Sequence, residues 1–138
     1  MTTPEASTRH LVEQYIDRYN EHDIEGLLDL FAPEVEQGGN RHDRDAIEGA
    51  FQTWVTAFPD IQVHPEQLLV DGTDAALHFS FTGTHAGSFL GIEATNEYVE
   101  VEEVLLFRAS DGVFTRFDAV WDELGMFVQI GAIDHPLG

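Results

Sequence analysis

The segment YVEVEEVLLFRASDGVFTRFDAVW, residues 98–121, contains two long runs in which apolar and polar side chains largely alternate. Residues 98–108 form the first run and residues 113–121 form the second. The pair Asp111-Gly112 separates them, and an Asp-Gly pair between alternating runs is a strong signal for the tight turn of a β-hairpin. The segment therefore predicts two long antiparallel strands.

Two further strands are expected upstream of this hairpin. In residues 77–82, Leu77, Phe79 and Phe81 alternate with polar neighbours, which is typical of a half-buried strand. Residues 61–70 form another run, and the turn Asp71-Gly72-Thr73-Asp74 connects the two. A last apolar piece, residues 124–130, is expected to be either a short helix or a bent strand.

The first part of the chain shows helical spacing instead. Thr3-Pro4 is a typical helix start, and apolar residues at three- and four-residue intervals predict a helix that extends to Asn20. Asp23 is expected to cap a second, short helix that includes Phe31 and ends at Pro33.

A loop at Gly38-Gly39-Asn40 and a third helix, from about Asp43 to Pro59, complete this half of the chain. Three helices followed by long antiparallel strands predict an α+β fold in which a curled antiparallel sheet wraps around the helices. We expect residues 1–138 to form one such domain, because a typical domain holds about 100–150 residues. The apolar interior of such a cone is a natural pocket for a small molecule.

The composition limits the partners that the protein can have. The chain has 26 Asp and Glu residues against 6 Arg and no Lys, which gives a formal net charge of −20. Nucleic acids and anionic membranes bind to clustered basic residues, so neither is an expected partner. Because the carboxylates are spread over the whole chain, we interpret the charge as adaptation to a salty cytosol, where screening weakens their mutual repulsion.

Several kinds of site are not expected from this sequence. The chain contains no cysteine, which excludes disulfides, thiolate metal sites and a cysteine nucleophile. The N-terminal residues lack signal-peptide character and no apolar run is long enough to span a membrane, so a cytoplasmic location is expected. Histidine spacing typical of a metal site, a phosphate-binding loop and a dinucleotide fingerprint are all missing, so neither a metal nor a cofactor is expected.

Three side chains are candidates for acid–base chemistry, and each has two interpretations. His78 faces solvent if the sheet is an ordinary one and lines the pocket if the sheet is curled. Glu103 interrupts the apolar alternation. Either a β-bulge there shifts which side chains face inward, which we favour, or the carboxyl group of Glu103 points into the apolar interior and has a raised pKa. Asp122 is either the N-cap of a final helix or an acid at the pocket wall.

The stretch GTHAGSFLGI, residues 83–92, resembles a segment of the SnoaL-like polyketide cyclases, which belong to the NTF2-like superfamily of cone-shaped α+β folds. Shorter segments match the same family in order and spacing. They are FPDI (58–61), FR (107–108) with DG (111–112), and WDELGM (121–126) with QIG (129–131). The resemblance extends from about Leu11 to Ile133.

This resemblance implies a homodimer that needs no cofactor and catalyses an intramolecular aldol ring closure of a polyketide ester. The acid–base aspartate of the family falls on Asp122. Asp118 stands where many relatives have Trp, which changes the expected shape of the pocket, and His78 stands where several relatives have a basic residue. The expected substrate-binding residues are His78, His85, Phe89, Trp54, Asp118 and Trp121.

We therefore expect a cofactor-independent acid–base enzyme that acts on a small apolar carbonyl or polyketide-like substrate, with Asp122 as general acid or base. One alternative is a protein of the same fold that binds a small apolar ligand without chemistry. Another is an epoxide-hydrolase or isomerase type of enzyme on this fold. A hydrolase, in which a carboxylate activates water, would need a second acid in the pocket, for which Asp118 and Glu103 are the candidates.

Overall fold

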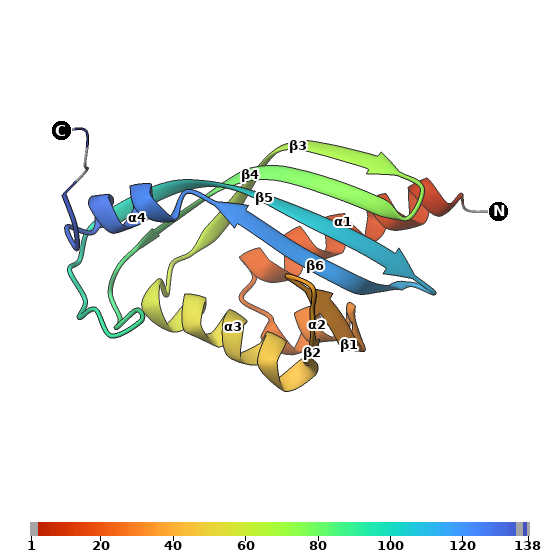
Figure 1. The fold of residues 1–138 in the computed structure, drawn as a ribbon, viewed down its shortest axis with the longest axis horizontal. Helices are drawn as coiled ribbons and strands as arrows, with labels where there is room; N and C mark the ends of the chain where they lie inside the picture. Colours follow the sequence, from red (N-terminus) through yellow and green to blue (C-terminus); the bar gives the residue numbers. More distant parts are fainter. Residues whose placement is uncertain (1–2, 135–136, 138) are drawn as a thin grey trace.

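The structure of the protein is a computed structural model that describes residues 3–134 and residue 137. These residues form helices and strands in the order shown in Figure 1. The helices are α1 (Pro4–Asn20), α2 (Ile24–Leu28), α3 (Arg44–Ala57) and α4 (Glu123–Gln129). The strands are β1 (Phe31–Gln37), β2 (Asn40–Asp43), β3 (Gln62–Asp71), β4 (Asp74–Thr84), β5 (Tyr98–Ser110) and β6 (Val113–Trp121).

The strands form one six-stranded sheet in the order β2-β1-β6-β5-β4-β3. The neighbouring strands are antiparallel except for β1 and β6, which are parallel, so the sheet is mixed rather than wholly antiparallel. The long strands curve over one side of the molecule, with α1 behind them and α3 beneath (Figure 1). The α+β fold, with a curled sheet around the N-terminal helices, is confirmed. No described helix is long and apolar enough to cross a membrane.

The predicted helix starts are confirmed by their capping contacts. The Thr3 hydroxyl accepts a hydrogen bond from the Ala6 N–H at 3.0 Å, with Pro4 in the first turn. The Asp23 and Asp43 carboxylates cap α2 and α3 in the same way, each at 2.9 Å. These side chains satisfy N–H groups that have no partner inside their helices, which fixes where each helix begins.

The prediction that the second helix includes Phe31 and ends at Pro33 was wrong. Helix α2 ends at Leu28, and Phe31 and Pro33 belong to β1, which pairs with β2 across the turn at Gly38-Gly39. Both glycines have positive φ angles, 58° and 80°, so they form a turn suited to a hairpin rather than an open loop. Phe31 is fully buried against Phe114 of β6, and this long-range contact overrides the local helical spacing.

The two hairpin turns predicted further along the chain, at residues 71–74 and 111–112, are confirmed by the pairing of the long strands. Residues 123–129 form a helix, which decides between the two alternatives for the last apolar piece.

The sheet has one face toward the helices and one face away from them. Across β4, β5 and β6 the inner face carries mainly apolar side chains, and they pack on Leu11, Val12 and Tyr15 of α1 and on Phe51 of α3. Glu103 lies on this inner face, paired with Phe79 of β4 and with Trp121 of β6.

The favoured prediction of a β-bulge at Glu103 was therefore wrong. The register of β5 against β4 runs without a break from Tyr98 to Arg108, so nothing turns the side chain outward. The other interpretation holds, and a carboxyl group points into the apolar interior.

Candidate functional site

A cavity of about 210 Å³ lies inside the curled sheet. Its walls come from α1, α3 and the inner face of the sheet, so residues far apart in the sequence meet there. The lining is mainly aromatic and aliphatic, with polar groups at a few positions. The lining residues are Tyr15, Tyr19, Gln37, Ala50, Phe51, Trp54, Ile61, Val63, Phe79, Phe81, Glu103, Phe117, Ala119 and Trp121.

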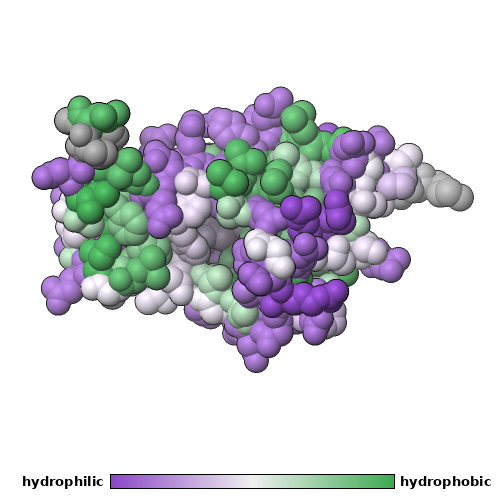
Figure 2. Space-filling view, in the orientation of Figure 1, coloured by the Kyte–Doolittle hydropathy of each residue, from purple (hydrophilic) through white to green (hydrophobic). Residues whose placement is uncertain are grey.

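The cavity has an exposed end and a buried end. Ala50 of α3 and Ala119 of β6 are exposed, and Gln37 at the end of β1 is half-buried, so these residues form the mouth. The surface between α3 and β6 is hollowed in Figure 2. Tyr15 and Tyr19 of α1 are 3% and 8% exposed and belong to the buried end. The cavity therefore extends from residues at the surface to the two buried tyrosines.

Glu103 is the acid that faces this cavity. Burial raises the pKa of its carboxyl group from the ordinary value of 4.5 to about 8, because the charged form loses its hydration there. In the described part of the chain, its carboxyl group has no ion pair and no hydrogen bond to another residue. Glu103 is therefore mostly protonated at neutral pH, and its pKa is close to the pH at which an acid–base catalyst works best.

Tyr15 and Tyr19 add two hydroxyl groups to the same space. They lie one helical turn apart on α1, with ring centroids separated by 5.8 Å. Burial raises the pKa of both hydroxyls, and the nearby charge of Glu103 raises it further, so both stay protonated. Neither hydroxyl forms a hydrogen bond with another described residue.

Of the predicted substrate-binding residues, Trp54 and Trp121 line the cavity. Their rings meet edge to face, with centroids 5.2 Å apart and planes at 79°. Phe89 is buried behind Trp54 with a centroid distance of 4.9 Å, and it is not a lining residue. Its loop therefore supports the tryptophan instead of contacting a ligand.

His85 is also buried away from the cavity and holds the loop that follows β4. Its Nδ1 lies 2.9 Å from the hydroxyl of Thr95 and accepts the Thr95 N–H at 3.3 Å. Its ring packs against Phe58, with centroids 5.6 Å apart. The contacts of His85 are thus those of a residue that orders residues 85–97.

His78 lies on the outer face of the sheet. Its register partner on β5 is Val104, one position away from the inward-facing Glu103, and successive side chains of a strand point to opposite faces. The ring of His78 lies between two carboxylates, with Nδ1 3.3 Å from Glu66 and Nε2 3.9 Å from Glu102. The prediction that His78 lines the pocket is therefore not supported by its position.

Among the described residues, Glu66, His78 and Glu102 are a group of three possible metal ligands whose ligand atoms lie within 4.8 Å of one another. Both glutamates are exposed, and the set resembles ordinary surface ion pairs. The expectation of a protein without a metal stays a prediction.

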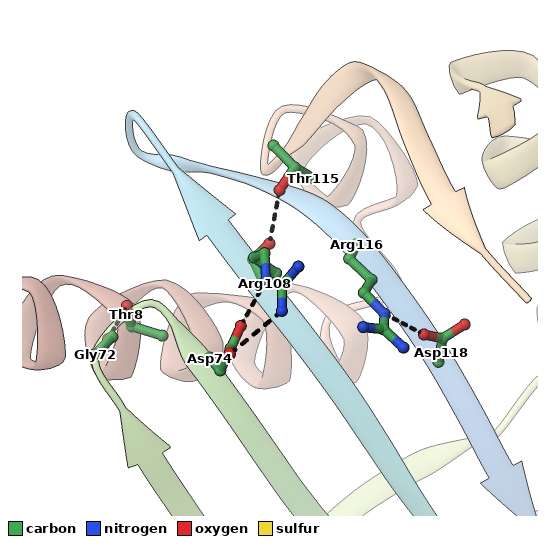
Figure 3. Close-up of polar contacts among 7 residues, drawn as sticks. All are labelled: Thr8, Gly72, Asp74, Arg108, Thr115, Arg116 and Asp118. Carbon is green, nitrogen blue, oxygen red and sulfur yellow. Dashed lines mark hydrogen bonds and ion pairs between the residues drawn. The ribbon is translucent and has the colours of Figure 1, made fainter. Parts of the chain in front are cut away.

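Asp118 holds the β1–β2 turn and does not line the cavity. Its carboxylate accepts a hydrogen bond from the Gly38 N–H at 2.7 Å. It also accepts one from Arg116 Nε at 2.6 Å, which is drawn in Figure 3. These hydrogen bonds, together with the positive charge of Arg116, lower the pKa of Asp118. A group with both oxygens occupied in this way keeps its charge at neutral pH and is poorly suited to accept a proton from a substrate.

Asp122 is exposed and caps α4. Its carboxylate accepts a hydrogen bond from the Gly125 N–H at 2.8 Å, and it does not line the cavity. The structure therefore matches the capping interpretation of Asp122. The catalytic role that the resemblance implies stays a prediction, and the side chain's position does not support it.

Comparison with known proteins gives the family. The family model described as SnoaL-like polyketide cyclase matches residues 9–130. The chain belongs to this family. The comparison with curated proteins gave no match.

Solved structures show the same fold for this SnoaL-like protein. TsrD from Streptomyces laurentii has a TM-score of 0.83 and 28% identity, over 93% of this chain and 97% of that chain. AclR from Streptomyces galilaeus has a TM-score of 0.85 and 22% identity, over 94% and 98%. A SnoaL-like polyketide cyclase from Agrobacterium tumefaciens strain C58 has a TM-score of 0.78 and 20% identity, over 95% and 100%.

Sequence reasoning missed part of the polar lining of this SnoaL-like cavity. Tyr15 and Tyr19 were counted only as apolar positions of the first helix, and Gln37 was part of a segment assigned to no strand. One signal was available: two hydroxyl-bearing residues stand four apart on a helix face that is otherwise apolar, so both hydroxyls reach the same side. Glu103 is marked in the sequence by its interruption of the apolar alternation, but a β-bulge, the favoured prediction, accounts for the same interruption.

Proposed function

We propose that this SnoaL-like protein moves a proton on a small neutral carbonyl compound held in the interior cavity, with Glu103 as the general acid and base. The observation that carries the proposal is the position of Glu103. Among the described residues that line the cavity it is the only Asp or Glu, and burial brings its pKa to about 8. Perturbed carboxyl groups in apolar pockets are typical of catalytic acids and bases.

The chemistry follows from the two protonation states of one carboxyl group. The carboxylate removes a proton from the carbon next to a carbonyl group, and an enolate forms while Glu103 gains that proton. Return of the proton to a different carbon completes an isomerisation. Attack of the enolate carbon on a second carbonyl group of the same molecule closes a ring, and Glu103 then protonates the new alkoxide. Such general acid–base catalysis contributes roughly 10²–10⁴-fold to a rate.

The size of the cavity supports a small substrate. Pockets that bury drug-sized ligands measure about 300–1,000 Å³, whereas this cavity measures about 210 Å³. A compound with one ring matches this space better than a multi-ring polyketide. We therefore assign the aldol or isomerisation chemistry to a smaller carbonyl compound.

The position of Asp122 favours a second candidate function, a binding protein without chemistry. Asp122, the acid expected from the family pattern, is exposed and occupied as a helix cap. In this case the cavity would hold a small apolar ligand, and Glu103 would only hydrogen-bond to it. A hydrolase is less well supported, since the second acid that it needs is absent from the described lining.

Exchange of ketone hydrogens for deuterium tests the proposal without knowledge of the natural substrate. The protein is incubated with acetophenone or cyclohexanone in D₂O, and NMR follows the loss of the signal from hydrogens next to the carbonyl group. We expect the wild type to accelerate the exchange and Glu103→Gln to lose roughly 10²–10⁴-fold of that acceleration. Glu102→Gln is the matched control, because Glu102 is the neighbouring residue on the outer face of the same strand.

Two results would contradict this assignment. If Asp122→Asn abolishes the exchange and Glu103→Gln does not, the aspartate is the acid and Glu103 is not. If both ketones bind without any acceleration of exchange, the protein functions as a binding module.

A further inference from the structure

We propose that Tyr15 and Tyr19 donate hydrogen bonds to the oxygen atom of the ligand, and that the cavity selects neutral single-ring ketones over carboxylates and phosphates. This inference rests on the proposed function for the location of the site. It adds the groups that recognise the ligand and the chemical class that they recognise.

The two tyrosines have hydroxyl groups without protein partners at the buried end of the cavity. Their side chains are more than nine-tenths buried, and neither hydroxyl has a hydrogen-bond partner among the described residues. Neither oxygen is among the fully buried atoms without a partner, so each borders open space, and both residues line the cavity. A ligand that displaces water from these hydroxyls must supply a hydrogen-bond partner, because a polar group buried without one costs free energy. A ligand oxygen that entered between α1 and β5 would supply the missing acceptor for both.

Both hydroxyls are available as donors toward such a ligand. Burial raises the pKa of Tyr15 and Tyr19, so both O–H groups keep their protons over the whole range in which the protein is handled. Glu103, when protonated, offers a third O–H group on the same side of the cavity. Three O–H donors in one cavity favour a ligand that brings a carbonyl oxygen, which can accept from more than one of them.

Charge complementarity excludes an anionic ligand. The described lining contains no Lys, Arg or His, and the chain as a whole carries a net charge of −20. A carboxylate or phosphate would lose its hydration in the cavity without gaining a cationic partner, and such burial of an unpaired charge is very costly. A neutral carbonyl group loses much less hydration and recovers two or three hydrogen bonds.

The rest of the lining favours a flat ring attached to the carbonyl group. Trp54 and Trp121 stand edge to face, and Phe79 and Phe81 of β4 complete an aromatic wall. Aromatic rings pack favourably in such edge and offset arrangements. Ala50 and Ala119 at the mouth are exposed and have small side chains.

Acetophenone and α-methylstyrene test this inference, because they share one shape and differ by the exchange of C=O for C=CH₂. Benzoate is the anionic member of the set. Dissociation constants come from ligand-observed NMR titrations of the wild type, Tyr15→Phe and Tyr19→Phe, with Tyr98→Phe as the matched control. Tyr98 is 62% exposed and does not line the cavity. Thermal melts check folding, which should be intact because the removed hydroxyls have no protein partner.

We expect the wild type to bind acetophenone more tightly than α-methylstyrene and not to bind benzoate. Each cavity variant should weaken acetophenone binding by roughly two- to tenfold, the usual effect of one lost hydrogen bond, and leave α-methylstyrene binding unchanged. Equal binding of the two neutral compounds, or no change in either variant, would overturn the inference. So would binding of benzoate.

This experiment and the exchange assay fail in different ways. Loss of selectivity in the tyrosine variants is measured at equilibrium and does not depend on turnover. A protein that selects acetophenone through its tyrosines but exchanges no hydrogens would refute the acid–base proposal and support the binding inference. A protein that exchanges hydrogens through Glu103 but binds acetophenone and α-methylstyrene equally would support the acid–base proposal and refute the binding inference.

Discussion

At the scale of single residues, Glu103 has surroundings that oppose the charged form of its side chain. It is paired with Phe79 on one neighbouring strand and with Trp121 on the other, and both partners line the same cavity. A carboxylate in this position has lost much of its water, which is why its protonated form is favoured.

This preference makes stability depend on pH. Below about pH 4.5 Glu103 is protonated in both the folded and the unfolded state. Between pH 4.5 and about 8 the unfolded chain has lost the proton while the folded protein keeps it, so the free energy of unfolding falls as pH rises through this window. The loss is complete above about pH 8 and is on the order of 5 kcal/mol, from about 1.36 kcal/mol per unit of pKa difference.

Glu103→Gln removes this dependence, because glutamine has the same shape and does not ionise. We expect the free energy of unfolding of the variant to exceed that of the wild type increasingly from pH 5 to pH 8, and the difference to be constant above that. Chemical denaturation of both proteins at several pH values and constant high salt measures this difference in the free energy of unfolding. Parallel curves for both proteins over the whole range would show that Glu103 is not buried as described.

Sequence analysis predicts some of the residues that line the cavity and not others, for a physical reason. Trp54 and Trp121 were among the substrate-binding residues expected with the family resemblance, and both line the cavity. Glu103 could not be assigned, since a bulge and an inward carboxyl group give the same local pattern. Only the register with β4, set by residues some 20–30 positions away, decides between them.

At the scale of the elements, α4 depends on its cap. Asp122 accepts the Gly125 N–H, and the helix that follows has only seven residues. Short helices are marginal on their own, so their ends contribute a large share of their stability. Asp122 is thus explained by the helix that it begins.

Two substitutions of Asp122 separate capping from catalysis. Asp122→Ala should lower the free energy of unfolding by about 0.5–2 kcal/mol, whereas Asp122→Asn should change it little, because Asn is an equally good N-cap. Neither should reduce the hydrogen exchange that Glu103 supports. Thermal melts and the exchange assay measure these effects. An Asn variant that is stable but inactive would restore Asp122 as the acid.

The element that sequence analysis missed, the β1–β2 hairpin, also belongs to the site. Periodicity alone favoured a helix around Phe31, because a run of apolar residues ending at Pro33 has the same appearance in a short helix and in a short strand. The hairpin places Gln37 at the mouth of the cavity. The bond from Gly38 to Asp118 ties its turn to β6, which is a contact over 80 positions of sequence.

At the scale of the whole molecule, the net charge of −20 should make folding depend on salt. The Debye length falls from about 10 Å at 0.1 M to about 3 Å at 1 M, so repulsion between the scattered carboxylates weakens as salt is added. We expect the midpoint of thermal unfolding to rise steeply from low salt to multimolar KCl, as followed by circular dichroism. Full stability at low ionic strength would contradict the interpretation of the charge as salt adaptation.

The predicted homodimer has a candidate interface on the outer face of the sheet. Leu69, Leu106 and Val120 are 59%, 40% and 66% exposed there. Apolar groups appear on this side of the molecule between hydrophilic ones (Figure 2). If two copies of the protein pair through this face, Leu106→Glu places a charge in the interface, and the variant protein should be a monomer in analytical ultracentrifugation. The interior cavity should still bind acetophenone, since it opens elsewhere. A dimer that survives this change would place the interface on another surface.

The aromatic wall of the cavity has a practical consequence. Trp54 and Trp121 are the two tryptophans of the chain, and both border the same space. Their emission is therefore a built-in optical probe of that space, without a label and without a background from tryptophans elsewhere. A compound library can be screened by intrinsic fluorescence, and replacing either tryptophan by phenylalanine assigns the signal to one side of the cavity.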